Sequence, residues 1–100
     1  MLQLSGGKIP FESWYESLDS ILQRAVDARL TRLAVGNFGD HKSVGGGVFE
    51  LRIPKGPGYR VYYGLQGSEI VVLIGGGDKG SQKKDIKRAY ELWRIWNYEK

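Results

Sequence analysis

Basic and aromatic side chains recur at alternating positions in two neighbouring segments of this 100-residue chain. Arg52 lies in an alternating apolar run at residues 48–53, and Arg60 and Tyr62 lie in a second run at residues 60–65, after a turn rich in Pro and Gly. Successive side chains of a β-strand point to opposite faces, so these three side chains can share one face of a sheet. Guanidinium groups hold phosphate oxygens through paired hydrogen bonds, so the pattern predicts a phosphate-binding surface.

Positive charge is concentrated in the second half of the chain. Residues 1–50 hold five Lys and Arg against six Asp and Glu, whereas residues 51–100 hold ten against five. The formal net charge of +4 therefore comes from the predicted strand pair and from the last predicted helix. This asymmetry favours a polyanionic partner, either a nucleic acid or an acidic protein.

Composition indicates one globular domain spanning residues 1–100, with 41% hydrophobic and 26% charged residues. The chain has no Cys and one His, so we expect no disulfide, no metal site and no cofactor. No apolar run approaches the roughly 20 residues of a membrane-spanning helix, and the N-terminus lacks the pattern of a secretory signal. We therefore expect a cytoplasmic protein that does not bind membranes.

Hydrophobic periodicity predicts an α+β fold, with an N-terminal helical hairpin, a small twisted and mainly antiparallel sheet of about four strands, and a C-terminal helix. A first helix begins at Pro10, and a second, capped by Asp19 or Ser20, ends near Gly36. A short edge strand is expected at residues 1–7. A loop is expected at residues 37–47, which are rich in Gly and polar side chains.

The almost continuous apolar run at residues 69–74 predicts the central, best-buried strand of the sheet. Three glycines at residues 75–77 follow it as an exit from the strand, with a phosphate cradle as the alternative interpretation. Asp78 or Ser81 is expected to cap the last helix. The apolar stripe predicted for this helix comprises Ile86, Ala89, Tyr90, Trp93 and Trp96.

Segments spread along nearly the whole chain resemble, in order, the RelE/ParE superfamily of toxins from type II toxin–antitoxin modules. The similarity is greatest to the HigB-like branch, also called addiction module killer proteins. The matching segments are residues 10, 11 and 14, residues 36–40 (GNFGD), 50–53 (ELRI), 56–62 (GPGYRVY) and 75–86 (GGGDKGSQKKDI). The resemblance implies a RelE-like fold.

The same resemblance implies an endoribonuclease that cleaves messenger RNA on the ribosome and inhibits translation, by attack of the ribose 2′-hydroxyl on the adjacent phosphate without a metal. Arg60 would stabilise the charge of the transition state, and Lys79 would bind phosphate or protonate the departing 5′-oxygen. Tyr62 would donate a hydrogen bond or stack on a base. Further candidates for RNA binding are Arg52, Lys55, Lys83 and Lys84.

The chain departs from the family pattern near the last helix. Well-studied RelE nucleases carry a tyrosine there as a candidate base, whereas this chain has Lys84 and Asp85. Asp85, Lys83 or Tyr62 could replace it, or the ribosome could position the substrate. His41 is expected to be structural or solvated.

Structural alternatives are a surface role for Arg60 and cross-strand packing for Tyr62. The functional alternatives are a non-enzymatic, ParE-like inhibitor of DNA gyrase and a degenerate toxin that retains only antitoxin binding. The partners that the resemblance implies are a cognate helix-turn-helix antitoxin, the ribosome with its messenger RNA, and operator DNA, contacted only through the antitoxin complex.

Overall fold

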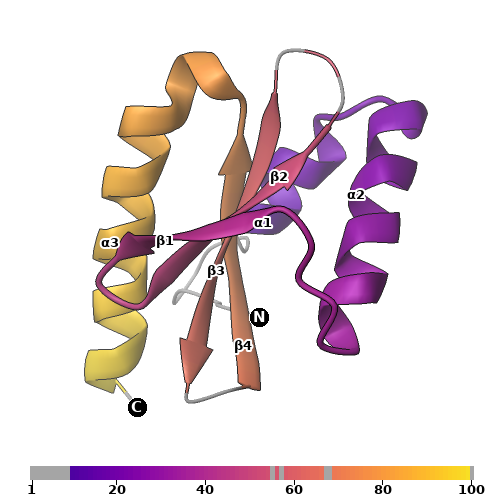
Figure 1. The fold of residues 1–100 in the computed structure, drawn as a ribbon. Coiled ribbons are helices and arrows are strands. Elements are labelled where there is room, and N and C mark those ends of the chain that lie inside the picture. Colours follow the sequence, from indigo (N-terminus) through magenta and orange to yellow (C-terminus); the bar gives the residue numbers. More distant parts are fainter. Residues whose placement is uncertain (1–9, 55, 57, 67–68, 100) are drawn as a thin grey trace.

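The computed structural model describes residues 10–54, 56, 58–66 and 69–99. An antiparallel sheet lies between one C-terminal helix and two N-terminal helices (Figure 1). Its strands are β1 (His41–Gly45), β2 (Val48–Ile53), β3 (Tyr59–Gln66) and β4 (Glu69–Gly77), in the order β1-β2-β3-β4. The helices are α1 (Pro10–Glu16), α2 (Ser20–Ala34) and α3 (Gln82–Glu99), the last preceded by a 3-10 turn, η1 (Lys79–Ser81). The predicted α+β class and the antiparallel order of consecutive strands are confirmed.

Two helices precede the sheet, as the sequence predicts. Asp19 caps α2, since its side chain accepts a hydrogen bond from the backbone nitrogen of Leu22 at 2.8 Å. After α2 the chain turns at Gly36, whose φ of +86° costs a glycine no steric strain. The Tyr15 hydroxyl of α1 donates to Asp27 of α2 at 2.8 Å, which links the two helices as a hairpin. The edge strand expected at residues 1–7 lies outside the described residues.

A strand replaces part of the loop predicted at residues 37–47, so that prediction is wrong for β1. β1 pairs with β2, for example through His41 and Leu51. Most of its side chains are exposed, and it forms one edge of the described sheet. A strand with so little buried surface does not need the apolar alternation by which strands are recognised in a sequence.

β4 is the last strand of the described sheet, so the prediction of a central strand at residues 69–74 is wrong. Helices nevertheless contact both of its faces, α1 on one and α3 on the other. Leu73 packs against the cluster beside α1 and α2, and Ile74 belongs to the cluster beside α3, so apolar side chains on both faces are covered without a central position. The three glycines belong to β4 itself rather than to an exit from it.

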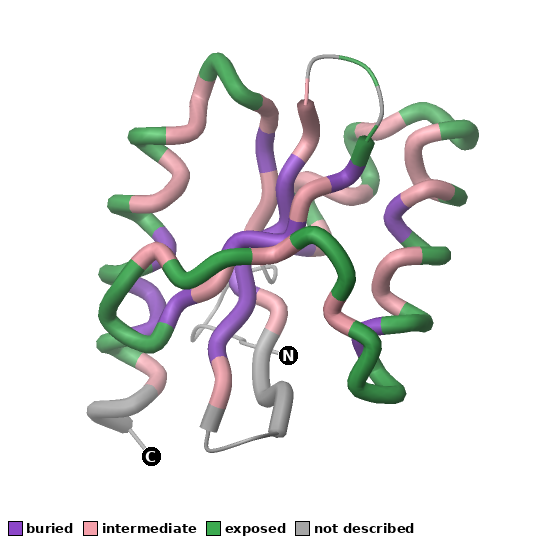
Figure 2. The backbone as a smooth tube through the Cα atoms, viewed as in Figure 1, coloured by how far each residue is buried: buried purple, intermediate pink, exposed green. Residues whose placement is uncertain are grey.

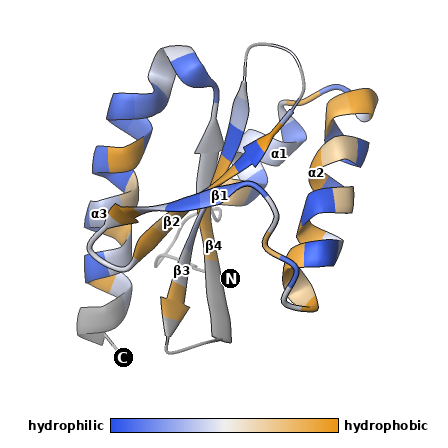
Figure 3. Ribbon diagram, in the orientation of Figure 1, coloured by the Kyte–Doolittle hydropathy of each residue, from blue (hydrophilic) through white to orange (hydrophobic). Residues whose placement is uncertain are grey.

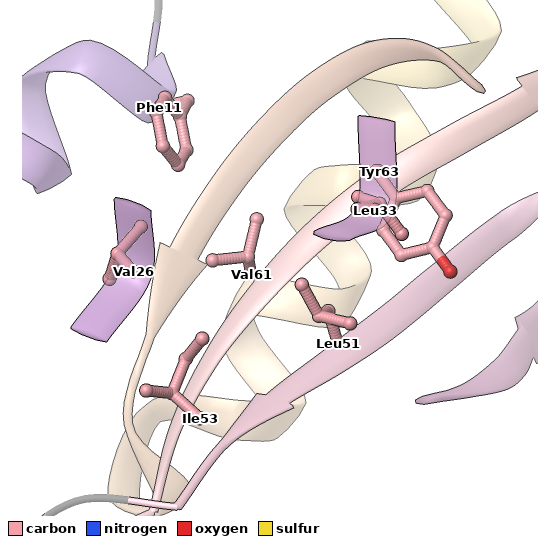
Figure 4. Packing of buried hydrophobic residues seen from close by; sticks show 7 residues of the cluster. All are labelled: Phe11, Val26, Leu33, Leu51, Ile53, Val61 and Tyr63. Atoms are coloured by element: carbon pink, nitrogen blue, oxygen red, sulfur yellow. The ribbon is translucent and has the colours of Figure 1, made fainter. Parts of the chain in front are cut away.

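The sheet buries one apolar cluster on each face, and the middle of the sheet is its most deeply buried part (Figure 2). On the face of α3 the buried residues are Val48, Tyr62, Ile74, Ala89, Leu92 and Trp93. On the face of α1 and α2 they are Phe11, Val26, Leu33, Leu51, Ile53, Val61 and Tyr63 (Figure 4). Side chains of β2 and β3 alternate between the two clusters, which confirms the predicted alternation.

The apolar stripe predicted for the last helix is confirmed except at one position. Ala89 and Trp93 are buried, and Ile86 and Trp96 pack against the same cluster. Tyr90 is instead 38% exposed, so it is not a core residue.

Gly75 and Gly76 offer a matched test of the packing on β4. A Cβ on Gly76 would overlap the ring of Trp14, whereas a Cβ on Gly75 would meet no atom within 4 Å. We expect Gly76→Ala to lower the free energy of unfolding by about 1–3 kcal/mol through overpacking. Gly75→Ala should change it by less than about 1 kcal/mol. Urea unfolding of both variants provides the measurement, and equal stabilities would contradict the contact between Trp14 and Gly76.

Candidate functional site

The register of the sheet places both predicted arginines at the end where α3 begins. Arg52 of β2 pairs with Arg60 of β3, and Arg60 pairs in turn with Gly77 of β4. A Cβ on Gly58 would lie 3.4 Å from Arg60 Nη1 and 3.8 Å from Lys79 Cβ, so this glycine lies between the two cationic residues. The structure therefore brings Arg52, Arg60 and Lys79 together from three different segments of the chain.

A fully buried carboxylate, Glu50, lies against the two arginines. Glu50 Oε1 is 3.2 Å from Arg60 Nε, and Glu50 Oε2 is 3.5 Å from Arg52 Nε. At the start of α3, Gln82 Nε2 donates a hydrogen bond to Glu50 Oε1 at 2.8 Å. Two positive charges and a hydrogen bond thus offset the cost of burying one negative charge.

Sequence patterns assign no function to Glu50, although the alternation of β2 places it on the face of Arg52. One signal in the sequence could have identified Glu50. It is an acidic residue at an inward-facing strand position, two residues before an arginine.

Arg60 is held on two sides and is only 10% exposed at its side chain. Its Nη1 donates to the carbonyl oxygen of Gly58 at 2.6 Å, and its Nε faces Glu50. The Nε atoms of Arg60 and Arg52 make no aligned hydrogen bond, so attraction between opposite charges holds them to the carboxylate. Arg60 Nη2 forms no hydrogen bond or ion pair with another described residue.

Arg52 is more accessible than Arg60, with 41% of its side chain exposed. Its Nη1 lies 4.0 Å from Asp40 Oδ1, which is itself 66% exposed. A pair this exposed contributes little to stability, so Arg52 can exchange Asp40 for another anion at small cost.

Lys79, Lys83 and Lys84 are exposed at the start of the C-terminal helical segment, whose first turns are hydrophilic (Figure 3). Asp78 and Ser81 form a capping box around η1, in which the Ser81 backbone nitrogen donates to Asp78 Oδ1 at 3.1 Å. This box fixes the turn from which Lys79 projects.

Tyr62 shares the face of the arginines but is buried, with 1% of the residue exposed. Its hydroxyl is 3.5 Å from Glu50 Oε1. Burial raises the pKa of Tyr62, the negative charges of Glu50 and Asp85 raise it further, and Arg60 lowers it. The raised pKa moves the phenolate of Tyr62 even further from neutral pH, so Tyr62 can donate a hydrogen bond but is unsuited to act as a base. Its buried ring is not open for stacking.

A cleft of about 350 Å³ lies between α1 and α3, with Gly75 and Gly76 in its lining. Tyr62 and Asp85 also border it. The Asp85 carboxylate, a candidate base, accepts a hydrogen bond from the Ser81 hydroxyl. Lys55, predicted to bind RNA, lies outside the described residues.

His41, the first residue of β1, lies on the opposite face of the sheet from the arginines. His41 Nδ1 is 2.9 Å from the Tyr63 hydroxyl, and its ring stacks with the rings of Phe38 and Phe49. These contacts agree with the structural role predicted for His41. Burial raises the pKa of Tyr63 to about 12, although the charge of Arg29 lowers it.

The described residues contain neither a candidate metal site nor a candidate membrane-spanning helix. No three His, Cys, Asp or Glu side chains of residues 10–54, 56, 58–66 and 69–99 gather in a way that could hold a metal ion. In the same ranges, no helix combines the length and the apolar composition needed to cross a membrane.

The fold and site define an α+β protein in which cations from three segments surround one buried carboxylate. The chain is 51% identical over 82 residues to an uncharacterized protein of Haemophilus influenzae, an alignment that covers 81% of this chain and 83% of the relative. The chain belongs to the same family as that protein. No family model matches the chain, and no solved structure matches it.

Removing Arg60 should lower the free energy of unfolding more than removing Arg52. Arg60→Ala leaves the Glu50 carboxylate buried without its more buried partner, and we expect the free energy of unfolding to fall by about 3–5 kcal/mol. Arg52→Ala removes an exposed partner of the same carboxylate and should cost about 1 kcal/mol or less. Urea unfolding provides the comparison. Equal losses in the two variants would contradict the unequal roles inferred from burial.

Tyr63 should make the stability of the protein depend on alkaline pH. The folded protein retains the phenolic proton up to a pKa of about 12, whereas the unfolded chain loses it near the ordinary value of 10.0. The stabilisation is complete below pH 10 and is lost as pH rises from 10 to 12, by about 2–3 kcal/mol. Denaturant unfolding between pH 9 and pH 12 measures this decline, which should be shallower for Tyr63→Phe. An identical decline in the variant would assign it to other groups.

Proposed function

We propose that this protein is the toxin of a type II toxin–antitoxin module, with a RelE-like fold. Its activity would be metal-independent cleavage of messenger RNA on the ribosome, which inhibits translation. One observation carries the proposal: Arg52, Arg60 and Lys79, which the resemblance to RelE/ParE toxins singles out, lie together at one end of the sheet. The family relationship with the Haemophilus influenzae protein does not support any particular activity, because that protein is uncharacterized.

The cation cluster suits the cleavage of RNA by its own 2′-hydroxyl. The 2′-oxygen forms a bond to the adjacent phosphorus and passes its proton to a base, for which Asp85 is a candidate, while the bond from phosphorus to the 5′-oxygen breaks and that oxygen gains a proton. The products are a 2′,3′-cyclic phosphate and a 5′-hydroxyl. The phosphate gains negative charge in the transition state, and cations already held in place stabilise that charge without reorganising.

We assign each residue a role in this reaction from its exposure. Arg52 and Lys79 are accessible and would make the first contacts with the RNA phosphates. Arg60 Nη2 would contact the phosphate that reacts. Because Arg60 is largely buried, its charge acts on that phosphate more strongly than it would in water. Lys79 would protonate the departing 5′-oxygen. Tyr62 would act through Glu50 rather than touch the RNA.

The proposal extends to the partners and the compartment. A cognate helix-turn-helix antitoxin would neutralise the toxin by covering the basic end of the sheet. Operator DNA would be contacted only through the complex with that antitoxin, and the protein would act in the cytoplasm, where ribosomes and messenger RNA are present.

Lys79→Ala is the sharpest test, because Arg60→Ala also weakens the fold. Wild type and variant are added to a reconstituted translation reaction, and messenger RNA ends are mapped by primer extension with and without ribosomes. Wild type should cut at the ribosomal A site, and loss of the Lys79 charge should slow cutting by about 10²-fold. Arg24→Ala is the matched control, since Arg24 is exposed on α2 across the sheet, and it should cut at the wild-type rate.

Folded wild type that leaves messenger RNA intact in both reactions would contradict the nuclease proposal. Growth arrest with DNA damage would then identify a gyrase inhibitor of the ParE kind. Harmless expression without an antitoxin would identify a degenerate toxin. A Lys79→Ala variant as active as wild type would overturn the role given to Lys79 alone.

A further inference from the structure

One flank of α3 carries a row of cations interrupted by a tyrosine. Lys83, Lys87, Tyr90 and Arg94 follow one another at intervals of four, three and four residues, which places them on one face of the helix. All four are exposed. The row extends about 16 Å along the helix axis. Its three cations form no ion pair within the part of the chain that the structure describes.

The tyrosine of this row borders an open groove of about 550 Å³. A Cβ on Gly46 would lie 3.4 Å from Tyr90 Cδ1, so the turn between β1 and β2 packs against the ring. The ring still keeps its 38% exposure, and Lys87 and Arg94 line the same groove. Glu91 also lines the groove, but its one negative charge is smaller than the combined positive charge of Lys87 and Arg94.

Cations that alternate with an exposed aromatic ring are suited to single-stranded RNA. Such sites combine positive charges that follow the phosphate backbone with aromatic rings on which bases stack. An acidic protein would use the charges but would not need the ring between them. The row begins at Lys83, close in sequence to Lys79, so an RNA strand leaving the cation cluster can continue along it.

We propose that this face of α3 binds single-stranded RNA beyond the cleavage cluster. Lys83, Lys87 and Arg94 contact successive phosphates, and one base stacks on Tyr90. The inference deepens the proposed function and rests on it only for the nature of the ligand, because binding at this face requires no cleavage.

Binding is tested with a short fluorescent oligouridine that carries 2′-O-methyl groups and so lacks the nucleophile for cleavage. Fluorescence anisotropy gives the association constant of the full chain at several salt concentrations. Replacing Lys87 and Arg94 together by Gln should reduce the slope of log K against log salt by about 1.4, because two phosphate contacts are lost. The control replaces Arg24 and Arg32 by Gln, removing two exposed charges from α2, and should keep the wild-type slope.

The ring is tested separately from the charges. Tyr90→Leu should weaken binding by about tenfold at an unchanged salt slope, because stacking is lost but no phosphate contact is. Tyr90→Phe should bind as wild type does. Thermal unfolding of each variant shows that the fold is retained.

The outcomes separate this inference from the proposed nuclease. No binding by wild type at low salt, or the same slope in the Lys87 and Arg94 variant as in the control, would overturn the inference even if messenger RNA is cut. RNA binding that depends on the row, in a protein that cuts no messenger RNA, would uphold the inference and overturn the nuclease.

Discussion

The burial of one negative charge organises the functional end of this protein. An ionised carboxylate away from water costs several kcal/mol unless opposite charges and hydrogen bonds surround it. Glu50 meets that requirement with Arg52 beside it on β2, Arg60 on β3 and Gln82 on α3. Cross-strand pairing and helix docking are therefore tied to the same carboxylate. A slip of one residue in the register would turn Arg60 to the other face of the sheet and leave Glu50 without it.

This arrangement divides the cations into two groups with different physical properties. Arg60 is buried and oriented, so its charge acts strongly on a phosphate placed directly against it. The lysines of η1 and α3 are exposed and flexible, so they attract a polyanion from a distance but are screened by salt. A site for a charged polymer benefits from both. The exposed cations attract the charged polymer to the site, and the buried arginine acts on one of its phosphates. The row along α3 extends the exposed group away from the buried one.

Local patterns predicted most of the fold because local physics decides those elements. The cap at Asp19 and the alternation of β2 and β3 depend on neighbours within a few residues. The two errors that concern β1 and the place of β4 in the sheet have the opposite cause. β1 is a strand because β2 offers it backbone partners, although its own side chains are mostly exposed. β4 is an edge of the described sheet, but α3 contacts one of its faces and α1, far away in the sequence, contacts the other.

The sequence by itself determined which side chains share a face, where the positive charge is concentrated and which residues suit phosphate chemistry, because each depends on residue type and short-range spacing. Only the tertiary structure decided how those residues are used. It paired Glu50 with Gln82, 32 residues away, buried Tyr62 and thereby raised its pKa, and left Lys79 exposed beside Gly58. Burial and long-range pairing set the charge and reach of each group, and neither is encoded by the spacing of nearby residues.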